Sequence, residues 1–300
     1  MCGIAGLFSK SPEVEAALGG HLAAMLMQLG DRGSDSAGLA IYRDRVPAGS
    51  TKVTLHSADP RQDWDRVQSA LDTGIGAGPV EVRASHAVIV VDTDAETAAG
   101  WLAERFPELR VMSAGEAIEI YKEAGLPRDF VERFDLASMS GTHALGHTRM
   151  ATESKVTTDG SHPFSTGLDL CLVHNGSLSN HNRLREQLRA EGIEFQTLND
   201  TEVAAGYLTW RLREGASLEA ALEGCLEDLD GFYTFAVGTV DGFAVLRDPI
   251  ACKPAVMAET DDWVAMASEY RAIAVLPGAD GARMWEPEPA TVYSWERQVA

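Results

Sequence analysis

Short apolar segments follow one another through the second half of the chain, and they constrain the fold more than any other feature. Tight turns between successive strands favour antiparallel pairing. Apolar runs with little alternation indicate that both faces of a sheet are covered. The simplest architecture is two antiparallel sheets packed together, with helices outside them. The segments with this pattern are THALGHTRMA, LDLCLVHNG, GFYTFAVGTV, GFAVLRD, PAVMAET, WVAMAS and TVYSWE.

The first 140 residues have a different pattern. Residues 4–8 form an apolar run typical of a buried strand, and residues 11–30 repeat apolar side chains at helical spacing. Between residues 44 and 140, strand-like and helix-like segments alternate, and GEAIEIYKEAG at 115–125 is predicted as a helix. The alternation predicts a small α/β insertion at 44–140 within a single domain that spans residues 1–300.

Charge and cysteine content exclude several classes of protein. The formal net charge of −20 makes a nucleic acid or an anionic membrane a poor partner. No apolar run approaches the ~20 residues that a membrane-spanning helix needs, and the first ten residues lack a secretory signal. The cysteines form no CxxC pair, which argues against a zinc site or a disulfide framework and predicts a reducing, cytoplasmic location. Cys171, Cys225 and Cys252 are predicted to pack in the core.

Cys2 comes just before the first predicted strand and allows two interpretations. One is structural: a small apolar residue begins an edge strand. The other is catalytic. If Met1 is removed, Cys2 carries an α-amine next to its thiol, and these groups supply a base and a nucleophile for covalent catalysis. The opening segment alone does not decide between the two.

Four polar segments lie at strand ends or in loops, where functional residues concentrate. Taken alone, each has a structural explanation: Asn175-Gly176 is a typical hairpin turn, Asp200 could cap a helix, and Arg149 could form an ion pair. Independent structural explanations for all four segments and for Cys2 are less plausible together. The segments are RGSDSAG (32–38), GHTRMAT (146–152) with HPF (162–164), HNG (174–176) and NDTE (199–202).

In this order, MCGIAGLF and the four polar segments resemble the class II glutamine amidotransferase domain of the N-terminal nucleophile hydrolases. The matching segments span residues 2–43 and about 142–255, roughly two thirds of the chain. The resemblance implies an α+β fold with four α/β/β/α layers, two stacked antiparallel sheets and, here, a small α/β insertion. This agrees with the architecture that the strand pattern indicates.

The resemblance also assigns roles to residues. It makes Cys2 the nucleophile that attacks the side-chain amide of L-glutamine, with its own α-amine as the base. Asn175 and Gly176 would donate to the tetrahedral oxyanion, through the side-chain amide and the backbone N–H. The residues expected to bind the substrate are Arg149 for the α-carboxylate, Asp200 for the α-ammonium group, and Thr152, Arg32 and Gly33 around them.

Members of this family usually pass ammonia to a second site, and no acceptor domain is recognisable after the RDPIACKP segment (247–254). The resemblance is greatest to the amidotransferase subunit of N-methylglutamate synthase, with split glutamate synthases second. It implies a cytoplasmic glutaminase subunit of a hetero-oligomer, without a cofactor or metal in this chain, and with FMN and an iron–sulfur cluster in the partner subunits. The alternatives are an N-terminal nucleophile hydrolase for another amide and a non-catalytic, glutamine-sensing scaffold subunit.

Overall fold

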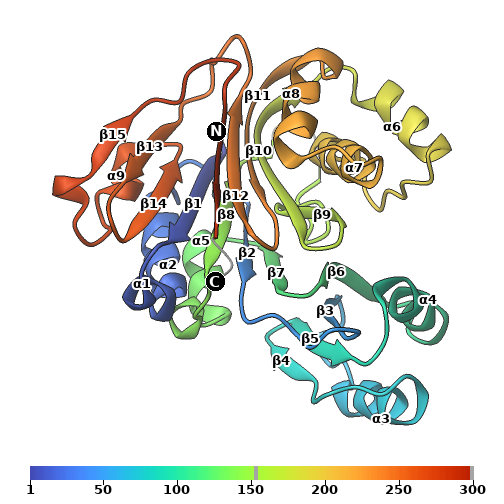
Figure 1. Ribbon diagram of the computed structural model, residues 1–300. Coiled ribbons are helices and arrows are strands. Elements are labelled where there is room, and N and C mark those ends of the chain that lie inside the picture. Colours follow the sequence, from blue (N-terminus) through green and yellow to red (C-terminus); the bar gives the residue numbers. More distant parts are fainter. Residues whose placement is uncertain (152–154, 298–300) are drawn as a thin grey trace.

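The computed structural model describes residues 1–151 and 155–297, and two stacked antiparallel sheets form its main body (Figure 1). The strand order in the seven-stranded sheet is β15 (Arg283–Trp285), β13 (Val256–Glu259), β14 (Trp263–Ala267), β1 (Gly3–Ser9), β8 (His143–Arg149), β2 (Ser36–Tyr42) and β7 (Ile118–Ala124). The order in the five-stranded sheet is β16 (Val292–Glu296), β12 (Gly242–Arg247), β11 (Gly231–Gly238), β10 (Leu170–Leu178) and β9 (Phe164–Gly167). The expected pair of stacked antiparallel sheets is confirmed.

Helices cover the outer face of each sheet, which gives four layers (Figure 1). The seven-stranded sheet is covered by α1 (Pro12–Ala16), α2 (Leu18–Gln28), α5 (Pro127–Arg133) and α9 (Tyr270–Ile273). The five-stranded sheet is covered by α6 (His181–Ala190), α7 (Asp200–Arg213) and α8 (Leu218–Asp228). The expected α/β/β/α order is therefore confirmed, although the helix expected over residues 11–30 is divided at Ala17 into α1 and α2.

Each sheet is buried on both faces. Along β1, Ile4 packs in the apolar cluster between the sheets, whereas Leu7 packs in the cluster under α2. Along β10, Val173 joins the cluster between the sheets and Leu172 the cluster under α6–α8. Because successive side chains of a strand alternate in direction, such a sheet needs apolar residues at nearly every position. This explains the apolar segments without alternation.

A smaller antiparallel sheet and two helices form a unit beside the main body, at the lower right of Figure 1. Its strand order is β4 (Glu81–Arg83), β5 (His86–Val91), β3 (Thr51–Ser57) and β6 (Leu109–Gly115), with helices α3 (Trp64–Gly74) and α4 (Ala95–Arg105). The unit has an apolar core of its own, which includes Leu55, Leu71 and Leu102. These elements occupy residues 51–115 of the insertion predicted at 44–140. From the same range, β7 and α5 belong to the main body.

The predicted helix at residues 115–125 is wrong. Residues 118–124 form β7, which pairs with β2 at the edge of the seven-stranded sheet. Ile118 and Ile120 pack between the sheets, whereas Tyr121 packs on the helix side. This is a strand period of two, but it is hidden in the sequence because the charged residues Glu119 and Lys122 are also buried.

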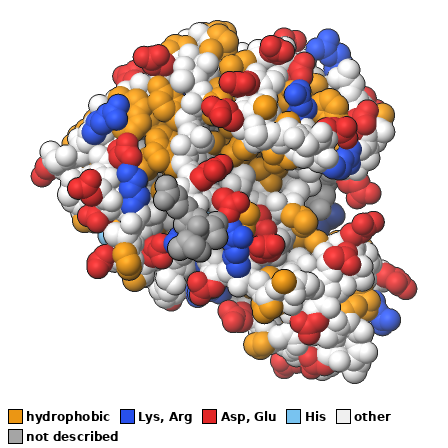
Figure 2. All heavy atoms as spheres, viewed as in Figure 1, with side chains coloured by type: hydrophobic (Ala, Val, Ile, Leu, Met, Phe, Trp, Pro, Cys, Tyr) orange, Lys and Arg blue, Asp and Glu red, His pale blue; other side chains and the backbone are white. Residues whose placement is uncertain are grey.

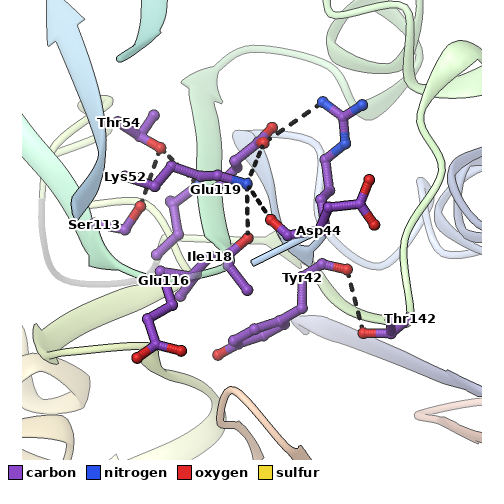
Figure 3. A network of polar contacts seen from close by, with 12 residues as sticks. Tyr42, Asp44, Lys52, Thr54, Ser113, Glu116, Ile118, Glu119 and Thr142 are labelled. Atoms are coloured by element: carbon purple, nitrogen blue, oxygen red, sulfur yellow. Dashed lines mark hydrogen bonds and ion pairs between the residues drawn. The ribbon is translucent and has the colours of Figure 1, made fainter. Parts of the chain in front are cut away.

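A buried ion pair joins the small unit to the main body (Figure 3). Lys52 Nζ on β3 lies 3.3 Å from Glu119 Oε1 on β7, and the two side chains are only 8% and 4% exposed. Lys52 also donates to the carbonyl oxygen of Asp44 at 3.1 Å, and the Tyr121 hydroxyl donates to Glu119 at 2.8 Å. The pair therefore links the small sheet to the edge strand of the large one.

Replacing Glu119 by leucine is expected to lower the free energy of unfolding by about 3–5 kcal/mol, because it leaves the Lys52 ammonium buried without its carboxylate. The double variant Glu119→Leu/Lys52→Met is expected to recover most of that loss, since the buried ammonium is removed together with its carboxylate. Arg43, which also lies 3.5 Å from Glu119 Oε1, is 29% exposed and can be solvated. Urea unfolding of the three proteins measures both changes. A double variant no more stable than the single one would contradict this account of the pair.

Acidic side chains are spread over the surface of both parts of the molecule. On the face shown in Figure 2, Asp and Glu lie over the main body and the small unit, with Lys and Arg between them. Among the helices of residues 1–151 and 155–297, none is long and apolar enough to cross a membrane. With a net charge of −20, such a surface repels polyanions.

Candidate active site

Three neighbouring strands of the large sheet bring Cys2, the RGSDSAG segment and the end of β8 to the same end of the sheet. β8 lies between β1 and β2, with Gly3 opposite Thr148 and Ser36 opposite Arg149. The backbone N–H of Asp35 donates to the carbonyl oxygen of Arg149 at 3.0 Å. Cys2, the loop before β2 and the end of β8 therefore lie side by side.

Cys2 is held at its backbone from two directions. Its carbonyl oxygen accepts hydrogen bonds from Arg32 Nε at 2.9 Å and from Asn175 Nδ2 at 3.1 Å. Arg32 comes from the loop after α2, and Asn175 comes from β10 in the other sheet. The half-buried Cys2 thiol contacts the carbonyl oxygen of Met150 at 3.7 Å. The arrangement fixes the main chain of Cys2 and leaves its thiol with one weak contact.

Gly33 explains why the loop beside Cys2 carries a glycine. A Cβ at this position would lie 2.4 Å from the carbonyl carbon of Thr148 and 2.5 Å from the backbone nitrogen of Arg149. Both atoms belong to the backbone of β8, which cannot move aside without breaking the sheet. Only glycine lets this loop approach the strand so closely.

Asn175 and Gly176 lie inside β10, so the hairpin-turn explanation of this dipeptide is wrong. Asn175 is opposite Thr234 and Gly176 is opposite Tyr233 in the ladder with β11. Gly176 has a φ of 154°, and a Cβ there would lie 2.0 Å from the carbonyl oxygen of Phe232. Gly176 is therefore required by a close backbone approach within the sheet.

Asp200 is the first residue of α7 and is not its N-cap, so that explanation is also wrong. The cap is Asn199, whose side chain accepts from the backbone N–H of Thr201 at 2.8 Å. The carboxylate of Asp200 instead accepts from the backbone N–H of Leu178 at 2.9 Å, and it lies 3.8 Å from His174 Nδ1. These contacts hold Asp200 against β10, the strand that carries Asn175.

Three buried histidines support this part of β10. The rings of His147 and His162 stack with centroids 4.0 Å apart, and His147 Nε2 lies 3.1 Å from the carbonyl oxygen of His174. The Thr201 hydroxyl bridges His174 and His162 at 3.0 and 3.2 Å. Burial lowers the pKa of all three rings, that of His147 to about 3. The histidines are therefore neutral at pH 7 and act as a polar packing layer.

Lys122 is a residue near the site that the sequence analysis missed. From β7, its ammonium donates to the carbonyl oxygens of Asp159, Ser161 and Pro163 at 3.1, 2.9 and 3.2 Å. Burial lowers the pKa of Lys122 to about 8. The lysine thus orders the loop that leads to His162. No signal pointed to it, because its segment has the composition of a helix.

The remaining cysteines differ in their burial. Cys171 and Cys225 are fully buried, as expected, and burial raises the pKa of Cys171 to about 12. Cys252 is exposed, so its predicted packing in the core is wrong: it lies in the loop between β12 and β13. Thr152, expected at the site, lies outside the described residues. In the part of the chain that the structure describes, no group of three or more His, Cys, Asp or Glu side chains could hold a metal ion.

Comparisons with known proteins find relatives over the whole chain. A family model described as "Glutamine amidotransferase domain" matches residues 147–275. The "Glutamine amidotransferase-like protein GlxB" of Rhizobium meliloti (strain 1021) is 57% identical over 303 aligned residues that cover 100% of both chains. A relative from Methanothermobacter thermautotrophicus (strain Delta H) is 32% identical over 98% of this chain and 99% of its own.

A solved structure has the same fold. It is the glutamine phosphoribosylpyrophosphate amidotransferase from B. subtilis, complexed with ADP and GMP, with a TM-score of 0.60 and 21% sequence identity. The match covers 98% of this chain and 49% of that protein. It confirms the N-terminal nucleophile hydrolase fold expected from the sequence. At 21% identity, the match supports the fold but not a shared activity.

Proposed function

The chain belongs to the class II glutamine amidotransferase family, and from this premise we propose that it is a glutaminase that hydrolyses L-glutamine through a thioester on Cys2. One observation carries the proposal. Asn175, which is 173 residues away in sequence and in the other sheet, donates to the Cys2 carbonyl at 3.1 Å. This contact places a side-chain N–H donor against the backbone of the residue that carries the thiol, and acyl transfer from an amide requires both a nucleophile and such a donor.

The proposed reaction has two halves. In the first, the α-amine of Cys2, free once Met1 is removed, takes the thiol proton, and Sγ attacks the side-chain carbonyl carbon of glutamine. The tetrahedral intermediate then collapses, the C–N bond breaks, and ammonia leaves with the proton that the amine held. In the second half, water attacks the thioester, which releases glutamate and restores the thiol.

Donors and charges around Cys2 would stabilise this chemistry. The Asn175 amide and the Gly176 N–H would bind the oxyanion, and each such donor is typically worth roughly 3 kcal/mol. Gly33 would offer its carbonyl oxygen to the leaving amide, and Arg32 would hold the backbone of Cys2.

The amino-acid end of the substrate would be held by two opposite charges. Arg149, buried at the end of β8, would bind the α-carboxylate with its guanidinium fork. Asp200, whose side chain is 23% exposed, would bind the α-ammonium group. A cation and an anion together select a zwitterion, which favours glutamine over amides that lack an amino-acid end.

Replacing Asp200 by asparagine is expected to raise the KM for glutamine about 10- to 100-fold, because the substrate ammonium loses a charged partner worth ~1.5–3 kcal/mol. The melting temperature is expected to stay the same, since the asparagine Oδ1 can still accept from the Leu178 N–H. Steady-state kinetics and thermal unfolding measure the two. Glutaramate, which is glutamine without its α-amine, is the control: both proteins should hydrolyse it equally. A normal KM with a lowered melting temperature would assign Asp200 a structural role only.

We further propose that the ammonia serves a separate synthase subunit, as in N-methylglutamate synthase, where the acceptor amine would be methylamine and the partner subunits would carry FMN and an iron–sulfur cluster. A split glutamate synthase is the second candidate. Purifying the chain with its native partners and assaying the complex with methylamine or ammonia distinguishes the two. A glutamine-sensing scaffold instead predicts glutamine binding without any release of glutamate.

The direct test of the glutaminase proposal is release of glutamate from glutamine by the purified chain, together with its intact mass. The mass is expected to lack Met1, because the proposed base is the amine of Cys2. A chain without Met1 that binds glutamine but releases no glutamate, alone or with its partners, would overturn the proposal.

A further inference from the structure

We propose that Glu269 is a positioning residue for the nucleophile, acting through Arg32; this inference rests on the glutaminase proposed above. Glu269 directly precedes α9 and lies on no motif that the sequence analysis singled out. Its role follows from two short ion pairs and from the position of Arg32 between Glu269 and Cys2.

Glu269 holds the guanidinium that holds Cys2. Its Oε1 accepts from Arg32 NH1 at 2.6 Å, while Nε of the same guanidinium donates to the Cys2 carbonyl oxygen at 2.9 Å. Its Oε2 accepts from Arg271 Nε at 2.6 Å. The carboxylate is thus fixed by two arginines, one of which, Arg32, contacts Cys2. Because a guanidinium is planar and rigid, fixing NH1 also fixes the direction in which Nε points.

The residue before Glu269 binds the same end of β1. Ser268 is buried, its hydroxyl accepts from the backbone N–H of Ile4 at 2.9 Å, and its own N–H donates to the Ile4 carbonyl oxygen at 3.0 Å. Two successive residues after β14 therefore hold the start of β1 in place. Ser268 binds Ile4 directly, and Glu269 holds Cys2 through Arg32. Chain ends normally fray, and this segment prevents it where the nucleophile lies.

A carboxylate is needed here for an electrostatic reason. The Arg32 side chain is only 8% exposed, so its charge is largely removed from water and requires a counter-charge. The Arg32 hydrogen bond, which is the main cause, lowers the pKa of Glu269, so the carboxylate stays ionised at neutral pH. Without the Glu269 carboxylate, a rotamer of Arg32 that exposes the guanidinium to water becomes more favourable, and in that rotamer the hydrogen bond to the Cys2 carbonyl is lost.

The experiment compares Glu269→Gln with Glu259→Gln, in the chain with its native partners. Glu259 is a matched control: it ends β13, which pairs with β14, and Glu269 lies two residues after β14. Glu259 pairs with Lys10 at 2.5 Å and is 27% exposed, against 30% for Glu269, but its ion pair involves neither Cys2 nor Arg32. Glu269→Gln is expected to lower kcat for glutamine about 10-fold with KM changed less than two-fold, because a displaced nucleophile affects the chemical step. Glu259→Gln is expected to change neither. Glu269→Asp, which keeps the charge, should recover part of the kcat.

Hydrogen exchange of the peptide that covers residues 2–8 gives a second readout, independent of catalysis. Exchange is expected to be faster in Glu269→Gln than in Glu259→Gln at equal melting temperature. Equal kcat and equal exchange in the two variants would overturn the inference while the glutaminase proposal stands. If glutamine is not hydrolysed at all, the glutaminase proposal fails, and the exchange comparison still decides whether Glu269 holds the N-terminus.

Discussion

Replacing Cys2 by alanine is expected to abolish glutamine-dependent ammonia release, with a fall in rate on the order of 10⁴-fold or more. Among the described residues, the other thiols lack the contact with Asn175 that Cys2 makes: Cys171 and Cys225 are fully buried, and Cys252 is exposed on the loop after β12. The measurement is release of glutamate from glutamine. In the full complex, turnover with free ammonia or methylamine is expected to continue, because Cys2 would serve only the hydrolase half.

The matched control for this variant is Cys252→Ser, which removes an exposed thiol and is expected to leave the rate unchanged. Unfolding should not differ much between Cys2→Ala and the unaltered chain, since the Cys2 thiol makes only the 3.7 Å contact with Met150. Equal loss of the glutamine-dependent and ammonia-dependent activities would contradict the proposal that Cys2 acts only in glutamine hydrolysis, because it would place Cys2 in a step that both reactions share.

Much of the fold could be predicted from the sequence because its burial pattern is simple. A sheet covered on both faces needs apolar residues on both faces. The consecutive residues Leu172 and Val173 pack on opposite faces, so the strand appears in the sequence as an unbroken apolar run. The same logic fails at β7. There, Glu119 and Lys122 are buried in an ion pair and a ring of carbonyl oxygens, so two positions that read as solvent-facing are inside.

The site could be predicted only where its residues occur in compact motifs. Cys2, Asn175 and Asp200 occupy short segments with unusual polar residues, and the structure brings Cys2 and Asn175 into contact and places Asp200 against the strand of Asn175. Glu269 and Lys122 act through other residues or through backbone carbonyls. A single sequence carries no sign of such contacts, because they depend on which loops the folded sheets bring together.

The stacking of the two sheets is what creates the site. Cys2 lies just before β1 of one sheet, and Asn175 lies in β10 of the other. The hydrogen bond between them therefore depends on the distance between the two sheets. The cluster between the sheets contains Ile4 and Val173, each two residues from one member of this pair. The apolar core thus sets the separation of nucleophile and amide donor, and changes to that core are expected to affect catalysis as well as stability.

Replacing Asn175 by alanine is expected to lower kcat about 10²- to 10³-fold, with KM changed only a few-fold, because an oxyanion donor acts in the transition state and not in substrate binding. Asn175→Asp keeps the size of the side chain but replaces the N–H donor by a negative charge, so it is expected to be at least as slow. Ser177→Ala, on an exposed residue of the same strand, is the control and should be unaffected.

Asn175 has a second contact that separates two explanations of this loss. Its amide also holds the Cys2 carbonyl, as Arg32 does from the other side. If Asn175 only positioned Cys2, Asn175→Ala would resemble Glu269→Gln, with a loss of about 10-fold. Stabilisation of the oxyanion predicts a loss larger by one or two further orders of magnitude. Kinetics of the two variants side by side, with melting temperatures to exclude unfolding, therefore decide whether the amide stabilises the transition state or only the resting site.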